Sequence, residues 1–106
     1  MVTFDEFSKL EIKIGTVTIA EKVHGADKLI RLELDIGGEM RQIVAGIAEY
    51  YTAAQLIGKQ MPVLVNLEGR KVRGVESKGM ILAVDVQGKP ILLTPDEQVP
   101  PGSKVR

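Results

Sequence analysis

Residues 66–83 read Asn-Leu-Glu-Gly-Arg-Lys-Val-Arg-Gly-Val-Glu-Ser-Lys-Gly-Met-Ile-Leu-Ala, a polar loop with three glycines that leads into an apolar strand. The segment contains four cationic and two acidic residues, so its local net charge is +2. The cationic residues are Arg70, Lys71, Arg73 and Lys78. Cationic side chains on a loop held between two strands are suited to contacts with phosphate groups.

The composition of the whole chain limits anion binding to this segment. The 106 residues include 14 basic and 14 acidic side chains, so the formal net charge is zero. Proteins that wrap bare duplex nucleic acid usually have a basic excess, and here only a local patch supports anion binding. Hydrophobic residues make up 44%, an ordinary globular fraction. This length and composition predict one domain over residues 1–106.

Several function classes are excluded or disfavoured by residue types that are rare or missing. The chain has no cysteine, which excludes disulfides, thiolate metal sites and a cysteine nucleophile. No apolar run approaches the roughly 20 residues of a membrane span. The first residues lack the basic start and apolar stretch of a signal peptide. We therefore expect a cytoplasmic protein without a membrane partner.

The pattern of apolar residues predicts five strands and a short helix between the third and fourth. The strands are expected at residues 11–23, 28–36, 40–45, 60–66 and 79–86. Thr52 and Gln55 have capping-box spacing for the helix, and Thr3 and Glu6 have it for a short N-terminal turn that reaches Ser8. Gly15 lies where the alternation of the first strand changes parity, which predicts a bulge there.

This element order is typical of the all-β OB-fold, a small five-stranded barrel that binds oligonucleotides or oligosaccharides on one face. A strand that bends to join both sides of the barrel fits the bulge expected in the first strand. An SH3-like barrel is the alternative, and the helix between the third and fourth strands disfavours it. The short N-terminal and C-terminal extensions lie outside the barrel, and residues 99–102 are expected to be ordered only by docking.

Residues that carry chemistry do not form a convincing catalytic or metal-binding set. His24 is the only histidine, and with Asp27 it is more simply interpreted as part of a polar turn. A metal site needs about three or four ligands. Ser77 has no histidine nearby in sequence, and the glycines at 69 and 74 are not followed by the Lys-Ser or Lys-Thr of a phosphate loop. We expect a binding module that is not an enzyme, with no cofactor and no small-molecule substrate.

The basic loop has two interpretations: a solvated hairpin loop or a phosphate-binding surface. In the second, its four cations contact phosphates, while Asn66 and Ser77 supply directional hydrogen bonds. Lys28 begins the second strand. In an OB-fold, this end of the barrel and the loop between the fourth and fifth strands lie on the same side of the binding face. Arg41 is a possible extension of the patch. Met80 is either an apolar contact for a base or ribose, or part of the core.

The four aromatic residues indicate which nucleic acid suits such a surface. They are Phe4, Phe7, Tyr50 and Tyr51, and none lies in the basic loop. Barrels that bind unstructured single strands usually stack bases on aromatic side chains. Recognition of a folded RNA by shape, phosphate and 2′-hydroxyl groups needs fewer of them. Phe4 and Phe7, with Leu10, form an apolar face that either packs on the barrel or enters a subunit interface.

The order Asn66-Leu67, Arg73-Gly74, Ser77, Gly79-Met80 resembles the signature of the tRNA-binding domain appended to methionyl-tRNA synthetases and found alone in small dimeric proteins. Three other segments resemble that family: residues 7–17, residues 25–29 and residues 41–47. In the last of these, Ala45 stands where the family usually has serine. The resemblance extends over nearly the whole chain.

This resemblance implies an OB-fold homodimer that binds the outer corner of the tRNA L and raises the tRNA affinity of a synthetase catalytic body. Carried over by position, its binding residues are Lys28, Asn66, Arg73, Ser77 and Met80. The basic-loop residues Arg70, Lys71 and Lys78 are added because of their charge. Two alternatives stay open: an export chaperone of the same fold that binds unfolded polypeptide, and a purely structural dimerisation module.

Overall fold

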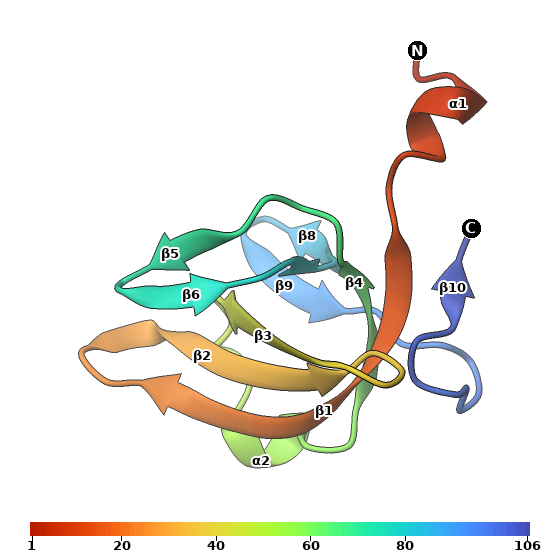
Figure 1. The fold of residues 1–106 in the computed structure, drawn as a ribbon. Helices are drawn as coiled ribbons and strands as arrows, with labels where there is room; N and C mark the ends of the chain where they lie inside the picture. The colour runs from red at the N-terminus through yellow and green to blue at the C-terminus, as the bar shows by residue number, and fades with distance from the viewer.

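The longest strand, β1 (Ile12–Val23), organises the barrel in the computed structural model, which describes residues 1–106 (Figure 1). The first part of β1 pairs with β4 (Gln60–Leu64) on one side and β10 (Lys104–Val105) on the other, and its second part pairs with β2 (Ala26–Asp35). The main sheet has the order β3-β2-β1-β4-β7, and every pairing in it is antiparallel. Because β1 serves both sides, one strand curls the sheet into a barrel.

The remaining strands are short. β3 (Met40–Ala45) matches its prediction residue for residue, and β7 (Met80–Ile81) pairs with β4. Two separate hairpins stand outside the main sheet: β5 (Arg70–Val72) with β6 (Val75–Ser77), and β8 (Ala83–Val86) with β9 (Lys89–Leu92). The predicted final strand at 79–86 is therefore two strands, and the basic loop contains two short paired strands that were not predicted.

The bulge of β1 lies further along the strand than predicted. The register with β2 shifts between Val17 and Ile19, and again between Lys22 and Val23, not at Gly15. Gly15 has a different role, because a Cβ atom added there would lie 3.1 Å from the side chain of Leu34. The glycine lets β1 approach β2 closely at the point where its pairing passes from β4 to β2.

The core is formed by the side chains that alternate inward along β2, together with residues of β1, β3 and β4. Ile30, Leu32 and Leu34 of β2 are fully buried. Helix α2 (Ala53–Leu56) closes the barrel with Leu56, and the predicted capping box of Thr52 and Gln55 starts it. Neither helix has the length and hydrophobicity that a membrane-spanning helix requires.

The C-terminal segment docks on its own barrel. The side chain of Gln60 donates to the Val99 carbonyl at 2.7 Å and accepts from the Val99 N–H at 3.0 Å. The Gly102 N–H donates to the carbonyl of Ile14 at 2.7 Å. These contacts lead the tail into β10, which extends the sheet beside β1.

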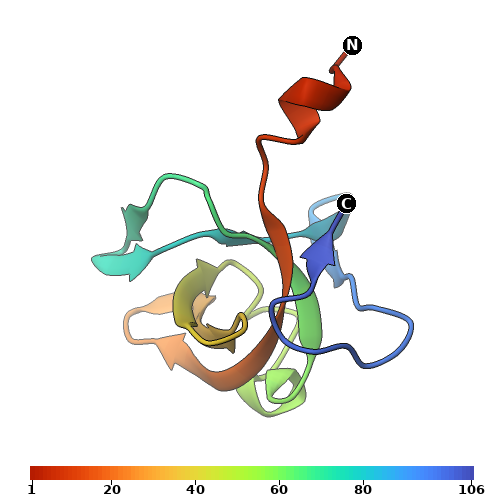
Figure 2. The ribbon, with the colours of Figure 1, turned by 45° about the vertical axis from the view of Figure 1, so that its right-hand side comes forward.

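The N-terminal helix α1 (Phe4–Phe7) projects away from the barrel (Figures 1 and 2). Its capping box, Thr3 with Glu6, forms as predicted. No residue of α1 is buried, and Phe4 is 82% exposed. The two chain termini lie on the same side of the molecule, and the β5–β6 hairpin lies on the other (Figures 1 and 2).

Candidate nucleic-acid interface

The basic loop is built around a tight two-residue turn. Val72 pairs with Val75 across the β5–β6 hairpin, so Arg73 and Gly74 form its tip. Both residues have positive φ, 52° for Arg73 and 80° for Gly74. This is the backbone region required at both central positions of a type I′ hairpin turn, whose twist matches that of the flanking strands. The turn therefore presents the Arg73 side chain at the outermost point of the hairpin.

The hairpin faces the turn between β1 and β2 across a groove of about 660 Å³. One wall is formed by residues 25–29 and the other by residues 70–73. The β1–β2 turn and the β5–β6 hairpin project at the same end of the barrel (Figure 1). The structure thus brings four of the expected site residues to one groove: Lys28, Arg70, Lys71 and Arg73.

The cations of this groove are free of partners within the protein. All four are exposed, and none takes part in an ion pair or a side-chain hydrogen bond. Asp27 is the single carboxylate residue of the lining. An unpaired exposed cation is available to a phosphate at little desolvation cost. The groove is therefore a concentrated positive site on a chain with no net charge.

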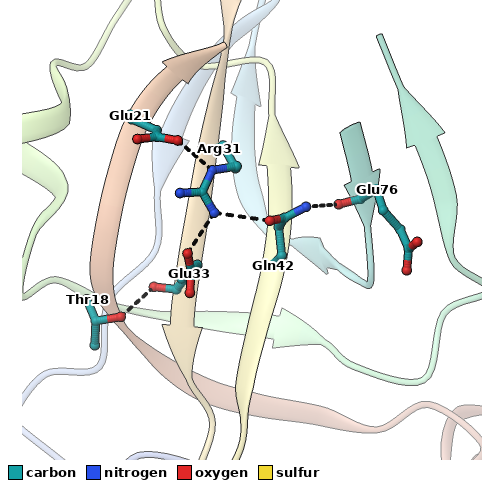
Figure 3. A network of polar contacts seen from close by, with 6 residues as sticks. All are labelled: Thr18, Glu21, Arg31, Glu33, Gln42 and Glu76. Atoms are coloured by element: carbon teal, nitrogen blue, oxygen red, sulfur yellow. Dashed lines mark hydrogen bonds and ion pairs between the residues drawn. The ribbon is translucent and has the colours of Figure 1, made fainter. Parts of the chain in front are cut away.

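A fifth cation, Arg31, differs from these four. Arg31 of β2 donates to Glu21 at 2.8 Å and to Glu33 at 2.7 Å (Figure 3). Hydrogen bonds to Glu33 and then to Glu21 raise the pKa of its guanidinium above the ordinary value. Its side chain is only 19% exposed, so two carboxylates and its surroundings already satisfy its charge.

Lys78 and Arg41 are also engaged with the protein. The ammonium group of Lys78 lies 3.3 Å from a carboxylate oxygen of Glu76, and both side chains are exposed. Arg41 donates to the carbonyl of Val65 at 2.6 Å and to the carbonyl of Lys78 at 3.0 Å. Arg41 therefore joins β3 to the segments on either side of the hairpin and does not project into the groove.

Two polar residues expected in the site, Asn66 and Ser77, lie outside the groove lining. The Asn66 amide accepts from the N–H of Glu11 at 2.8 Å and donates to the carbonyl of Lys9 at 2.7 Å. Ser77 is 3% exposed; its hydroxyl accepts from the Val44 N–H at 3.0 Å and donates to the Gly79 carbonyl at 3.2 Å. Asn66 thus fixes the segment that leads to α1, and Ser77 fixes the base of the hairpin.

Met80 is exposed on β7, next to the hairpin base rather than in the groove. Gln42 is a residue that the sequence analysis left without a role. It lies half-buried on β3 and contacts both Arg31 and the hairpin (Figure 3). The signal that could have found it is its position between Arg41 and the core residue Ile43, where a polar side chain faces outward from a strand.

An OB-type barrel with a cationic groove between the β1–β2 turn and the β5–β6 hairpin is typical of nucleic-acid-binding proteins. The chain matches the family model described as a putative tRNA binding domain over residues 12–104, and it belongs to that family. The predicted family and the OB-fold are both confirmed.

The sequence relatives are methionine–tRNA ligases. That of Methanothrix thermoacetophila is 51% identical over 106 residues, and that of Archaeoglobus fulgidus is 54% identical over 104 residues. These matches cover 100% and 98% of this chain but only 16% of each relative. The matching part is the non-catalytic C-terminal region of the synthetases. The chain is a tRNA-binding domain of this type, which confirms the prediction of a binding module.

Two solved structures resemble the whole chain. A MetRS-related protein from Pyrococcus horikoshii has a TM-score of 0.95 and 41% identity, with 100% of this chain and 98% of that one covered. The chaperone CsaA from Bacillus anthracis has a TM-score of 0.91 and 37% identity, with 100% and 99% covered. The barrel, the hairpins and the terminal extensions therefore have counterparts in free-standing proteins.

Proposed function

We propose that residues 1–106 act as one domain that binds folded tRNA in the groove between the β1–β2 turn and the β5–β6 hairpin. The observation that carries this proposal is the convergence of four unpaired cations from two separate segments on one groove. Lys28 contacts phosphates from one wall, and Arg70, Lys71 and Arg73 contact them from the other. Phosphate contacts of this kind fix the position of an RNA without reading its sequence.

The absence of aromatic side chains from the groove supports a folded RNA as the ligand. The lining consists of residues 25–29 and 70–73, none of them aromatic. A single strand would need bases stacked on such side chains. A folded RNA presents a rigid contour of phosphates and 2′-hydroxyl groups, which two projecting hairpins contact from opposite sides.

The other expected site residues have secondary roles in this proposal. Lys78 and Met80 extend the surface beyond the groove. The ammonium group of Lys78 forms an ion pair with Glu76 there. Asn66 and Ser77 contribute through the backbone segments that their hydrogen bonds hold.

A filter-binding titration tests the proposal. We expect folded tRNA to bind more tightly than a scrambled oligonucleotide of the same length. We also expect affinity to fall with salt, with a slope of about 0.7–0.9 per phosphate neutralised. Replacing Arg73 with Ala should cost roughly 1–3 kcal/mol if its contact is directional. Equal affinity for both RNAs would contradict recognition of the fold.

We propose further that the domain forms a homodimer through α1 and works beside a synthetase catalytic body in the cytoplasm. The apolar side chains of Phe4, Phe7 and Leu10 are 82%, 40% and 45% exposed. A second RNA site linked to a catalytic body raises the effective concentration of tRNA at that body. Sedimentation tests the dimer: a monomer at micromolar concentration would contradict it.

The likeness to CsaA favours one second candidate, a chaperone that binds unfolded polypeptide. Besides α1, the surface has a shallow hollow near the tail, with Ile14, Pro62, Leu93 and Val99 in its lining. A chaperone of this type should suppress the aggregation of a model substrate equally well with and without tRNA. Competition by tRNA would show that one surface serves both ligands.

A further inference from the structure

The β5–β6 hairpin carries three of the four groove cations, yet its own strand pairing is slight. Each of its strands has three residues, and the pair forms a sheet separate from the barrel. An isolated two-stranded hairpin is at best marginally stable in water. The width of the groove, and so the spacing between Lys28 and the cations opposite, depends on whatever holds this hairpin to the barrel.

Side chains and backbone of β3 hold the base of the hairpin. The Gln42 side chain donates to the carbonyl of Glu76 at 2.8 Å, and the N–H of Lys78 donates to the Gln42 carbonyl at 2.9 Å. The Ser77 hydroxyl accepts from the N–H of Val44, and Arg41 donates to the carbonyl of Lys78. Residues 76–78 thus lie along β3 as a paired strand would. Side-chain hydrogen bonds take the place of most of the backbone hydrogen bonds that would join two such strands.

Gln42 is the member of this set whose side chain also bonds to a side chain of β2. Its amide oxygen accepts from Arg31 at 3.0 Å, which leaves the amide nitrogen pointing toward the carbonyl of Glu76 (Figure 3). Arg31 has no acceptor to offer, so the oxygen of the amide must face it. Arg31 is in turn held by Glu21 of β1 and Glu33 of β2. A chain of polar contacts therefore runs from β1 across β2 and β3 to the hairpin.

We propose that Gln42, oriented by Arg31, is a positioning residue for tRNA binding that sets where the β5–β6 hairpin lies relative to the β1–β2 turn. The inference rests on the proposed use of the groove for tRNA. The Nε and Nη1 groups of Arg31 donate to Glu21, Glu33 and Gln42, so we assign Arg31 the part of orienting the Gln42 amide. Gln42 carries no charge. Replacing it with another uncharged residue therefore changes the geometry of the groove and leaves the net charge of the groove unchanged.

The test replaces Gln42 with Met, which has nearly the same shape but neither the donor nor the acceptor. The matched control is Gln98→Met, at an exposed glutamine of the C-terminal segment whose side chain makes no hydrogen bond. We expect Q42M to lower tRNA affinity by about 3- to 10-fold, as the loss of one net hydrogen bond predicts. The control should bind like the unaltered protein.

Amide hydrogen exchange at Lys78, measured without tRNA, separates positioning from direct contact. The N–H of Lys78 donates to the backbone of Gln42, a bond that the substitution does not remove chemically. If the side chain positions the hairpin, this amide should exchange faster in Q42M, because the base of the hairpin opens more often. Should Q42M lack a cooperative thermal transition, Gln42→Asn, which is too short to reach both partners, replaces it.

Two results would overturn the proposal. One is tRNA affinity in Q42M equal to that of the unaltered protein. The other is reduced affinity with unchanged exchange at Lys78, which would make Gln42 a direct RNA contact. Failure of the groove assignment is a separate result, because then Arg73→Ala would also leave tRNA affinity unchanged.

Discussion

Two elements project from this barrel, and they differ in every property that selects a partner. The β5–β6 hairpin presents unpaired cations beside a groove. Helix α1 presents Phe4 and Phe7, and its two acidic residues, Asp5 and Glu6, lie in its first turn. The first suits the phosphates of RNA, and the second suits an apolar protein surface. The proposed function therefore places RNA binding and self-association on different projections of one small barrel.

The same segment of chain fixes the bases of both projections. Asn66, directly after β4, accepts from and donates to the backbone of residues 9–11, next to α1. Ser77, at the other end of the basic segment, is bonded to β3 below the hairpin. The comparison teaches that polar residues of the motif build the supports, while its cations form the surface. The following substitutions separate these roles.

The largest effect is expected for the apolar projection. The double substitution Phe4→Ser with Phe7→Ser should weaken the dimer by about 3–6 kcal/mol, because two aromatic side chains lose their burial. Analytical ultracentrifugation over a range of concentrations measures the change. Affinity of a single groove for tRNA should stay the same, and a dimer of unchanged strength would place the interface elsewhere.

The next effect concerns the charged projection. Combined replacement of Arg70, Lys71 and Arg73 with Ala should reduce tRNA affinity by roughly 2–4 kcal/mol and lower the salt slope by about 2, through lost phosphate contacts. A control with three other exposed lysines changed to Ala, Lys59, Lys89 and Lys104, should retain both values. Thermal stability should be little altered in either variant, because none of these side chains makes an internal bond.

Asn66→Ala tests whether this residue supports a projection or contacts RNA. Its removal takes away two hydrogen bonds to residues 9–11, worth about 1 kcal/mol each. We expect a lower melting temperature and a weaker dimer, measured by calorimetry and sedimentation, with tRNA affinity per groove unchanged. If tRNA affinity falls while the dimer persists, the residue is an RNA contact, as its position in the motif implies.

The smallest effect is expected for Lys78→Ala. Its ammonium group already interacts with Glu76, so removal of the pair's positive member should change tRNA affinity by less than about 0.5 kcal/mol. Filter binding beside Arg73→Ala gives the comparison under one set of conditions. A loss as large as that of Arg73 would mean that tRNA displaces Glu76 and recruits this lysine.

The parts of the fold that depend on neighbouring residues were predictable from the sequence. Both capping boxes lie within three residues of chain, and both formed as expected. The alternation of β2 gave the core face directly, because side chains of a strand point to opposite sides. The family motif gave the barrel as a whole.

The parts that depend on distant partners were not. β4 ends at Leu64 rather than at residue 66, and the predicted last strand divides at Leu82: the residues before it pair with β4 and those after it pair with β9. The strands β5 and β6 were missed because arginine rarely occupies the first position of a type I′ turn, where Asn, Asp or Gly is usual. The N-terminal face of Phe4 and Phe7 had two possible outcomes, and only the structure shows that the barrel leaves it exposed.

The sequence pointed to the cationic residues of the basic loop, but it did not show which of them form ion pairs within the protein. Arg73 and Lys78 are equivalent by composition, yet one is free and the other is paired. Lys28 joined the groove because OB topology places its turn beside the basic segment. Whether Ser77 or Gln42 faces inward or outward depends on the closure of β3 against the hairpin base, which involves residues more than 30 positions apart.

The placement of both chain ends opposite the β5–β6 hairpin has a practical consequence (Figures 1 and 2). An affinity handle, a fluorescent label or a biosensor surface joined to either end would leave the groove open to solvent. Immobilised molecules would then present the groove outward in one common orientation. A short linker between the chain end and the label or surface would suffice, because the attached group lies on the side away from the groove.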